Sequence, residues 1–184
     1  MALMELNMIL KKALLLCASF IFTHTLYANE DRVKLVGDIF YALIPLGSYT
    51  STFYMDDDKG RMEFYKSFAM TAGLTYGLKY TVDAPRPDGS DNHSFPSGHS
   101  SITFQSAVFL HKRYGLKYAL LSYAGATFVG FSRVYANEHY SRDVIAGAFV
   151  GAVSAWIFTE KYKNLSLDLK VEKKEKFFTL TYSY

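Results

Sequence analysis

Residues 116–159, LKYALLSYAGATFVGFSRVYANEHYSRDVIAGAFVGAVSAWIFT, decide the fold, because two apolar stretches flank a short polar segment. The stretches Leu116 to Phe131 and Val144 to Thr159 contain a single charged residue, Lys117. Ala, Gly, Ser and Thr recur in both stretches, and small residues allow helices to approach closely. We therefore predict two helices that can approach their neighbours closely and that have the polar segment between them at one end.

Three further apolar stretches complete a predicted all-α fold, a helical bundle of about five core helices. They run from Leu35 to Tyr54, from Phe64 to Val82 and, in a shorter one, from Ser100 to Leu110. With 184 residues the chain is long enough for one sizeable core and too short for two ordinary domains. Half of the residues are hydrophobic and 17% are aromatic, which excludes a disordered chain. The net charge of +3 is not gathered into a basic stripe, so we expect no nucleic-acid partner.

The two ends of the chain differ from this body. Residues 1–28 carry two lysines, an apolar run of about ten residues and a small residue at Ala28, a pattern typical of a signal peptide or signal anchor. Residues 29–160 form the predicted helical domain. Residues 161–184 form a basic tail whose alternating apolar and polar residues predict a short β-hairpin. A single cysteine, Cys17, excludes an intramolecular disulfide.

The first of three polar clusters contains Lys79 and Arg86. Lys79 ends a helical pattern, and Arg86 follows on a loop, residues 83–96, that holds three of the four prolines in the chain. An ammonium group offers a point charge, and a guanidinium can donate two hydrogen bonds to an anion such as phosphate. Taken alone, such a pair at a helix end usually faces solvent.

The second cluster is Ser94-Phe-Pro-Ser-Gly-His99, directly before an apolar helical pattern. The free amides and the positive dipole end of a helix favour an anion. Ser97 can donate its hydroxyl, Gly98 allows close approach of the backbone, and His99 can carry a proton. An ordinary Ser-Gly helix cap also explains the Ser and Gly, but it gives no reason for the histidine.

The third cluster, Arg133 to Asp143, lies between the two apolar stretches. His139 and Asp143 are four residues apart, so on a helix the carboxylate can hold one ring nitrogen and present the other as a nucleophile. Arg133 adds a second guanidinium. The alternative is a helix-capping Asp143 beside an exposed histidine.

Together the clusters resemble the three-part signature of the type 2 phosphatidic acid phosphatase superfamily. The pattern is Lys79-x6-Arg86-Pro87, then Pro96-Ser97-Gly98-His99, then Ser132-Arg133-x5-His139-x3-Asp143. The resemblance runs from about Phe64 to Thr159. About ten defined residues at fixed spacings make a specific signal.

The resemblance implies a role for each of these residues. His139 would attack phosphorus and form a phosphohistidine, with Asp143 orienting it, and His99 would protonate the leaving oxygen and then activate water. The oxygens of the phosphoryl group would be bound by a set of five residues: Lys79, Arg86, Ser97, Gly98 and Arg133. No cofactor and no metal are expected, since the five histidines form no recognisable ligand set.

The predicted function is a metal-independent phosphatase acting on a lipid phosphate or pyrophosphate: an isoprenoid carrier diphosphate, phosphatidate, phosphatidylglycerophosphate or a lipid A phosphate. The alternatives are a soluble periplasmic acid phosphatase with broad monoester specificity and a non-catalytic lipid-phosphate binder. A vanadate-dependent haloperoxidase has a similar anion pocket, but such enzymes are generally much larger.

The arrangement of the apolar stretches favours the inner membrane of a bacterial cell envelope. If they span it, all three clusters lie on one side, and the segments on the other side carry more Lys and Arg. That bias places the site toward the periplasm. The shortness of the Ser100 to Leu110 stretch keeps a soluble periplasmic protein as the alternative.

Overall fold

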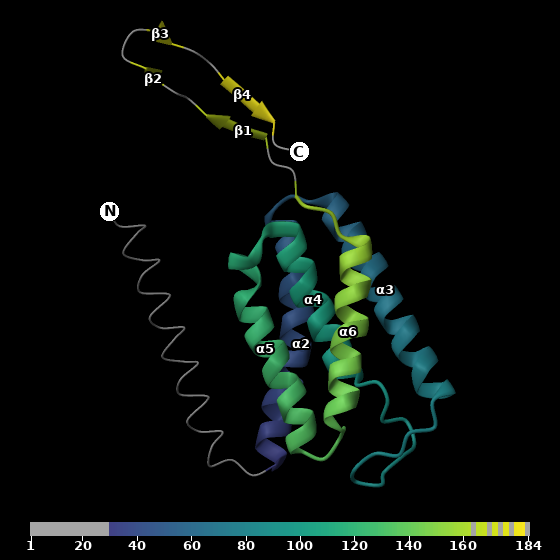
Figure 1. Ribbon diagram of the computed structural model, residues 1–184. Helices are drawn as coiled ribbons and strands as arrows, with labels where there is room; N and C mark the ends of the chain where they lie inside the picture. The colour runs from purple at the N-terminus through teal and green to yellow at the C-terminus, as the bar shows by residue number, and fades with distance from the viewer. Residues whose placement is uncertain (1–29, 163–164, 169–170, 173–174, 177–178, 183–184) are drawn as a thin grey trace.

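The computed structural model describes residues 30–162 and, beyond them, residues 165–168, 171–172, 175–176 and 179–182. Within this described part the helices form one bundle (Figure 1), which confirms the all-α prediction. They are α2 (Glu30–Tyr54), α3 (Asp58–Thr81), α4 (Gly98–Tyr114), α5 (Leu116–Tyr135) and α6 (Ser141–Phe158).

Helix α4 lies at the centre of the bundle and contacts each of the other four helices (Figure 1). It is longer than the predicted Ser100 to Leu110 stretch, because the helix continues through its charged last turn. It ends where Gly115 adopts a positive φ of 102°, a conformation that glycine adopts without steric cost. Because α4 has polar residues at both ends, the sequence pattern reveals only its apolar middle part as a helix.

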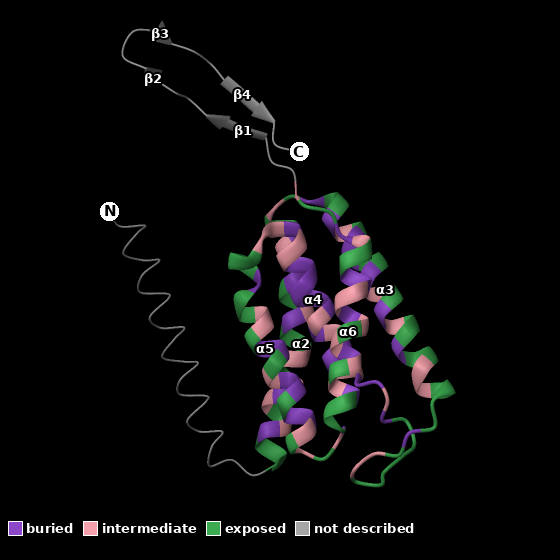
Figure 2. Cartoon of the chain, viewed as in Figure 1, coloured by how far each residue is buried: buried purple, intermediate pink, exposed green. Residues whose placement is uncertain are grey.

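Small and hydroxyl-bearing side chains fill much of the bundle interior, as the buried segments in Figure 2 show for α4. On α6, a Cβ at Gly147 would lie 2.3 Å from the carbonyl oxygen of Ser97, and a Cβ at Gly151 would lie 1.9 Å from that of Ser101. Helix α6 can approach α4 this closely only because both positions are glycine. The close approach ties the start of α6 to the start of α4, where the second and third polar clusters lie.

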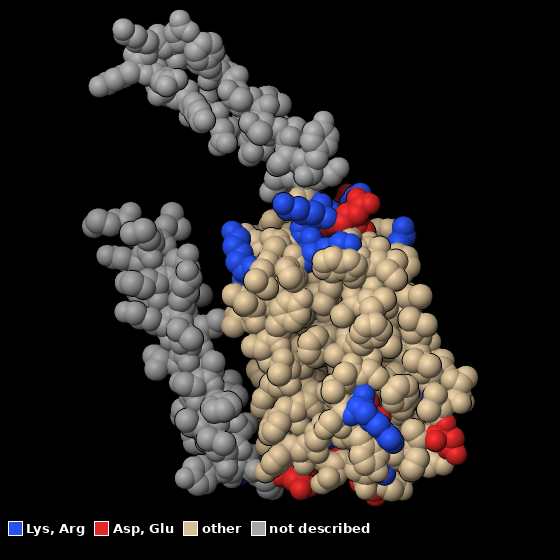
Figure 3. All heavy atoms as spheres, viewed as in Figure 1, with Lys and Arg blue, Asp and Glu red and all other residues tan. Residues whose placement is uncertain are grey.

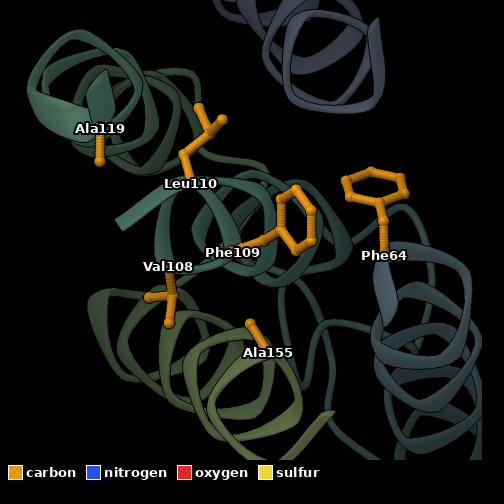
Figure 4. Packing of buried hydrophobic residues seen from close by; sticks show 6 residues of the cluster. All are labelled: Phe64, Val108, Phe109, Leu110, Ala119 and Ala155. Atoms are coloured by element: carbon orange, nitrogen blue, oxygen red, sulfur yellow. The ribbon is translucent and has the colours of Figure 1, made fainter. Parts of the chain in front are cut away.

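A hydrophobic cluster joins α3, α4, α5 and α6 (Figure 4). Its buried members are Phe64, Val108, Phe109, Leu110, Ala119 and Ala155. The rings of Phe64 and Phe109 meet edge to face, with their centroids 5.1 Å apart. This cluster packs the four helices together near the end of the bundle at which α4 connects to α5.

A buried ion-pair network closes the same end. Arg113 donates to both carboxylate oxygens of Asp57 at 2.6 and 2.5 Å and to Glu63 at 3.2 Å. Asp57 also caps α3, since its side chain accepts a 2.9 Å hydrogen bond from the Gly60 amide. The network connects the start of α3 to the end of α4.

The outside of the bundle is unusually apolar. Many large hydrophobic side chains are exposed on α2, α3, α5 and α6, among them Leu43, Leu74, Leu121 and Phe149. On the face shown in Figure 3, charged side chains lie toward the two ends, and the band between them carries none. Among the described residues one helix, Ser141–Phe158, is long and apolar enough to cross a membrane.

At the two ends of the chain, the structure describes only part of the residues. The predicted signal segment, residues 1–28, lies outside the described residues. In the tail, β1 (Leu165–Asp168) pairs antiparallel with β4 (Thr179–Tyr182), and β2 (Val171–Glu172) pairs with β3 (Glu175–Lys176). The residues that connect these strands lie outside the described part, so the β-hairpin stays a prediction, as do the domain limits.

Candidate active site

The three polar clusters meet at one end of the bundle. The last turn of α3, the first turn of α4 and the α5–α6 connection lie there, together with the first turns of α2 (Figure 1). A cavity of about 320 Å³ opens between them. Its lining residues are Tyr41, Ala72, Thr75, Tyr76, Lys79, Arg86, His93, Gly98, His99, Ile102, Glu138 and His139. Five of the eight predicted site residues therefore line one cavity; Ser97, Arg133 and Asp143 are buried behind it.

His139 is positioned by the turn that connects α5 to α6. Its backbone amide donates to the carbonyl of Arg133 at 3.2 Å, after Asn137 has reversed the chain with a φ of 54°. The side chain is only 4% exposed. The imidazole is thus held at the cavity wall by a rigid turn.

The contact between His139 and Asp143 differs from the expected one. Helix α6 begins at Ser141, after His139, so the spacing of four residues on one helix does not apply. Nδ1 of His139 and Oδ2 of Asp143 are 4.0 Å apart, beyond hydrogen-bonding distance. Asp143 instead accepts a 3.0 Å hydrogen bond from the Tyr140 amide, so it caps α6, as the alternative interpretation expected.

Ser94 connects the two groups. Its hydroxyl donates to Asp143 Oδ2 at 2.6 Å, and its oxygen lies 3.3 Å from His139 Nδ1. Because the serine hydroxyl donates its hydrogen to the carboxylate, the serine oxygen accepts a hydrogen bond from Nδ1–H of His139. The neutral imidazole then carries its proton on Nδ1 and keeps the lone pair on Nε2. The expected orientation of His139 by Asp143 thus runs through a serine.

The surroundings of His139 favour its neutral form. Burial, together with the positive charges of Arg86 and Lys79, lowers the pKa of His139 to about 4. A histidine with this pKa is unprotonated at neutral pH, as a nucleophile must be.

The start of α4 presents Gly98 and His99 to the cavity. Ser97, directly before them, caps the helix: its side-chain oxygen accepts from the Ser100 amide at 3.5 Å and from the Ser100 hydroxyl at 3.2 Å. Its own amide donates to the carbonyl of Asp143 at 2.9 Å. Ser97 thus joins the first turns of α4 and α6, and its hydroxyl is used for capping.

Lys79 and Arg86 face the cavity from α3 and the loop after it. Lys79 Nζ donates to the carbonyl of His93 at 2.6 Å. Arg86 Nε donates to Asp91 at 2.8 Å, and its Nη1 donates to the carbonyl and carboxylate of Glu138 at 3.1 and 3.2 Å. The two cations are therefore held by the loop and by the residue before His139.

Arg133 is 2% exposed and reaches toward α2. Its Nη1 donates to Asp38 Oδ1 at 2.8 Å and its Nη2 to the carbonyl of Lys34 at 2.8 Å. The same Asp38 oxygen lies 3.0 Å from His99 Nε2. Arg133 thus binds protein groups in this structure, and it connects α5 to α2.

Three residues of the site were missed by sequence reasoning: Ser94, Asp38 and Glu138. Asp38 carried a signal, since it is the only charged residue between Leu35 and Tyr54, and a lone carboxylate in an apolar helix is often functional. Ser94 and Glu138 have no comparable signal, because their partners come from other segments of the chain.

Within the described residues, no group of three or more His, Cys, Asp and Glu side chains is placed to hold a metal ion. The cavity lining offers three imidazoles, two cations and the start of α4, a helix N-terminus whose free amides favour an anion.

Comparison with known proteins identifies the family. The model of the PAP2 superfamily matches residues 62–166, more than half of the chain and all three polar clusters. The chain belongs to the PAP2 superfamily. A lipid A 4'-phosphatase of Helicobacter pylori (strain J99) is 31% identical over 148 residues, which cover 73% of this chain and 74% of that protein.

A further relative and a solved structure are similar to parts of the chain. A lipid A 1-phosphatase of Porphyromonas gingivalis is 38% identical over 86 residues, which span 45% of this chain and 19% of that longer protein. The crystal structure of Aquifex aeolicus LpxE has a TM-score of 0.54 at 21% identity, with 70% of this chain and 93% of that one covered, and it shows the shared fold. The predicted phosphatase class, a hydrolase of phosphate esters, is confirmed, and the relatives support a lipid phosphatase.

Proposed function

We propose that this protein is a metal-independent phosphatase that hydrolyses a lipid phosphate or pyrophosphate through a phosphohistidine intermediate. One observation carries the proposal: a single cavity brings together His139, His99, Lys79 and Arg86, with the Ser94–Asp143 pair behind His139. A protein that only binds phosphate needs the cations, but it does not need an oriented histidine.

In the first step, Nε2 of His139 attacks phosphorus, and the bond between phosphorus and the lipid oxygen breaks. Ser94 and Asp143 stabilise the proton on Nδ1 as the ring becomes positively charged. His99 gives a proton to the departing oxygen. The products are a lipid alcohol and a phosphoryl group on His139.

In the second step, His99 takes a proton from water, and the water oxygen attacks phosphorus. The bond between phosphorus and Nε2 breaks, inorganic phosphate leaves, and both histidines return to their starting forms. Lys79 and Arg86 would bind the phosphoryl oxygens, with the amide of Gly98 at the start of α4. Arg133 and Ser97, being buried and engaged with protein groups, would hold the site in shape in the resting state.

The cavity lining also includes groups that fit an apolar substrate tail, namely Tyr41, Ala72, Tyr76 and Ile102. Helices α2 and α3 carry further exposed hydrophobic side chains. A lipid would place its phosphate among the cations and its chain against these apolar groups. The lipid A phosphatase relatives favour a lipid A phosphate among the candidates.

The distribution of charged residues supports a membrane position, because both ends of the described bundle carry Lys and Arg and, on the face shown in Figure 3, uncharged helix surface separates them. The orientation with the site facing the periplasm is supported by the larger number of Lys and Arg in the sequence segments away from the three clusters, residues 161–184 included. An alkaline wash of isolated membranes tests this: retention is expected, and release without detergent would favour the soluble periplasmic alternative.

Release of inorganic phosphate from a substrate panel tests the function. The panel contains a lipid A phosphate, phosphatidate, phosphatidylglycerophosphate, an isoprenoid diphosphate and a soluble monoester. Turnover of a lipid substrate, its loss in His139→Asn, inhibition by vanadate and resistance to EDTA are expected. Turnover of only the soluble ester, or full activity in His139→Asn, would contradict the proposal.

A further inference from the structure

The carboxylate of Asp38 contacts two of the predicted site residues at once. Its Oδ1 lies 3.0 Å from His99 Nε2 and accepts a 2.8 Å hydrogen bond from Arg133 Nη1. Asp38 is on α2, which lies outside the segment matched by the family model. The first described helix therefore contributes directly to a site whose sequence signature lies elsewhere.

The position of Asp38 is set by a close contact between α2 and α5. A Cβ at Gly37 would lie 2.1 Å from the hydroxyl oxygen of Ser132 and 2.7 Å from Nη2 of Arg133, so a larger residue does not fit there. This approach brings the Lys34 carbonyl within 2.8 Å of Arg133 Nη2. Arg133 thus holds α2 by hydrogen bonds to the Lys34 carbonyl and to the Asp38 side chain. The position of Asp38 at the site follows from the position of α2.

The His99 ring is held on two sides. Asp38 fixes Nε2, and the ring of Tyr41, one turn further along α2, packs against the imidazole with its centroid 4.1 Å away. An ionised carboxylate accepts but does not donate, so Nε2 carries the proton of the neutral ring. The ring nitrogen that takes up and releases the second proton is then Nδ1. Burial and the charge of Arg133 lower the pKa of His99, and Asp38 opposes this shift by stabilising the charged ring.

We propose that Asp38 is a positioning residue that holds His99 in the orientation and tautomer needed to protonate the leaving oxygen and then activate water. Asp38 acts through the imidazole and does not bind the phosphoryl group. The site would then contain two histidines that are each oriented by a carboxylate. Asp143 orients His139 through Ser94, and Asp38 orients His99 directly. This inference rests on the proposed function of the cavity.

The dependence on the leaving group separates this role from simple support of Arg133. An alkoxide leaves poorly unless it is protonated, whereas a nitrophenolate leaves without help. In the first step, therefore, a defect in His99 affects an alkyl phosphate much more than a nitrophenyl phosphate. A defect in Arg133 or in helix packing affects both substrates alike.

The experiment measures kcat/KM for dodecyl phosphate and 4-nitrophenyl phosphate with the full chain in detergent, because kcat/KM reports the steps up to departure of the leaving group and not the later hydrolysis of the phosphohistidine. Asp38→Ala is expected to lose kcat/KM by at least about tenfold on dodecyl phosphate and by less than about threefold on 4-nitrophenyl phosphate. Asp31→Asn, which changes an exposed carboxylate on the same helix, is the control and should match the wild type. Asp38→Asn replaces Asp38→Ala if the alanine variant does not fold, as judged by its elution and thermal melting.

A double variant gives a second, independent readout. In a His99→Ala background, the further change Asp38→Ala should lower kcat/KM on dodecyl phosphate by less than about twofold, because the carboxylate has no imidazole left to orient. Equal losses on both substrates, or fully multiplicative losses in the double variant, would overturn the role of Asp38 while the proposed function stands. A wild-type protein that releases phosphate from neither substrate would overturn both.

Discussion

The Ser94 hydroxyl lies 2.6 Å from Oδ2 of Asp143, and this hydrogen bond determines how the carboxylate reaches the histidine. Asp143 also caps α6 through the Tyr140 amide, so a single oxygen serves both the helix and the site. The orientation of His139 therefore depends on the loop before α4 as well as on α6.

Ser94→Ala removes this connection and leaves His139 Nδ1 without its serine acceptor. We expect kcat to fall by about tenfold to a hundredfold with little change in KM, because orientation is lost and the phosphate-binding cations are kept. Steady-state kinetics on the preferred lipid substrate measure the effect. Ser90→Ala, in the exposed part of the same loop, is the matched control, and a Ser94→Ala enzyme as active as this control would exclude the serine from the mechanism.

The titration of His139 is expected far below that of an ordinary histidine. Its pKa of about 4 means that the ring stays neutral as the pH falls from 7 to 5, while an unfolded chain takes up the proton near pH 6.5. The folded state therefore loses about 2 kcal/mol of stability from this group over that interval. NMR of ¹³C-labelled histidine, with the signal assigned by its absence in His139→Asn, measures the pKa, and a midpoint near 6.5 would contradict the burial described.

The contact of α6 with α4 predicts opposite effects for two glycines. Gly151→Ala places a Cβ on the Ser101 carbonyl and should destabilise the protein by about 1–3 kcal/mol. Gly73→Ala meets nothing within 4 Å and should be neutral or stabilising, by up to about 1 kcal/mol, because alanine favours the helix. Thermal melting in detergent compares the two, and an equal response would argue against the close packing of α6.

The buried pair between Asp57 and Arg113 predicts a strong effect far from the cavity. Asp57→Asn leaves the Arg113 charge, which is 4% exposed, with Glu63 as its remaining carboxylate partner. A loss of about 3 kcal/mol or more is expected. Asp56→Asn is the neighbouring control, since Asp56 is exposed and asparagine tolerates its positive φ. If denaturant unfolding shows the same stability for both variants, the network does not hold this end together.

The helical fold was predictable from the apolar stretches, but the residues at which individual helices begin and end were harder to predict. The stretches from Leu116 and Val144 were located to within a few residues, because almost no charge interrupts them. The length of α4 was underestimated, since its charged last turn is buried by Asp57 and Glu63, which come from a distant part of the sequence.

The candidate site was predictable only where its residues lie at fixed spacings. The three clusters identified His99, His139, Lys79 and Arg86, which line the cavity, whereas His93, which also lines it, belongs to none of them. The roles of Ser94 and Asp38 depend on tertiary contacts across 49 and 61 residues, and no local pattern encodes these contacts. The direct contact expected between His139 and Asp143 assumed a helix that in fact starts two residues after the histidine.

The central claim is that His139 carries the phosphoryl group during turnover. Brief reaction with a ³²P-labelled lipid phosphate, followed by quenching in alkali and peptide mapping, tests it most directly. We expect a label that is stable in base, labile in acid and located on His139, and that is absent from His139→Asn. A wild-type enzyme that turns over the substrate without such a label, or with the label on another residue, would contradict the account.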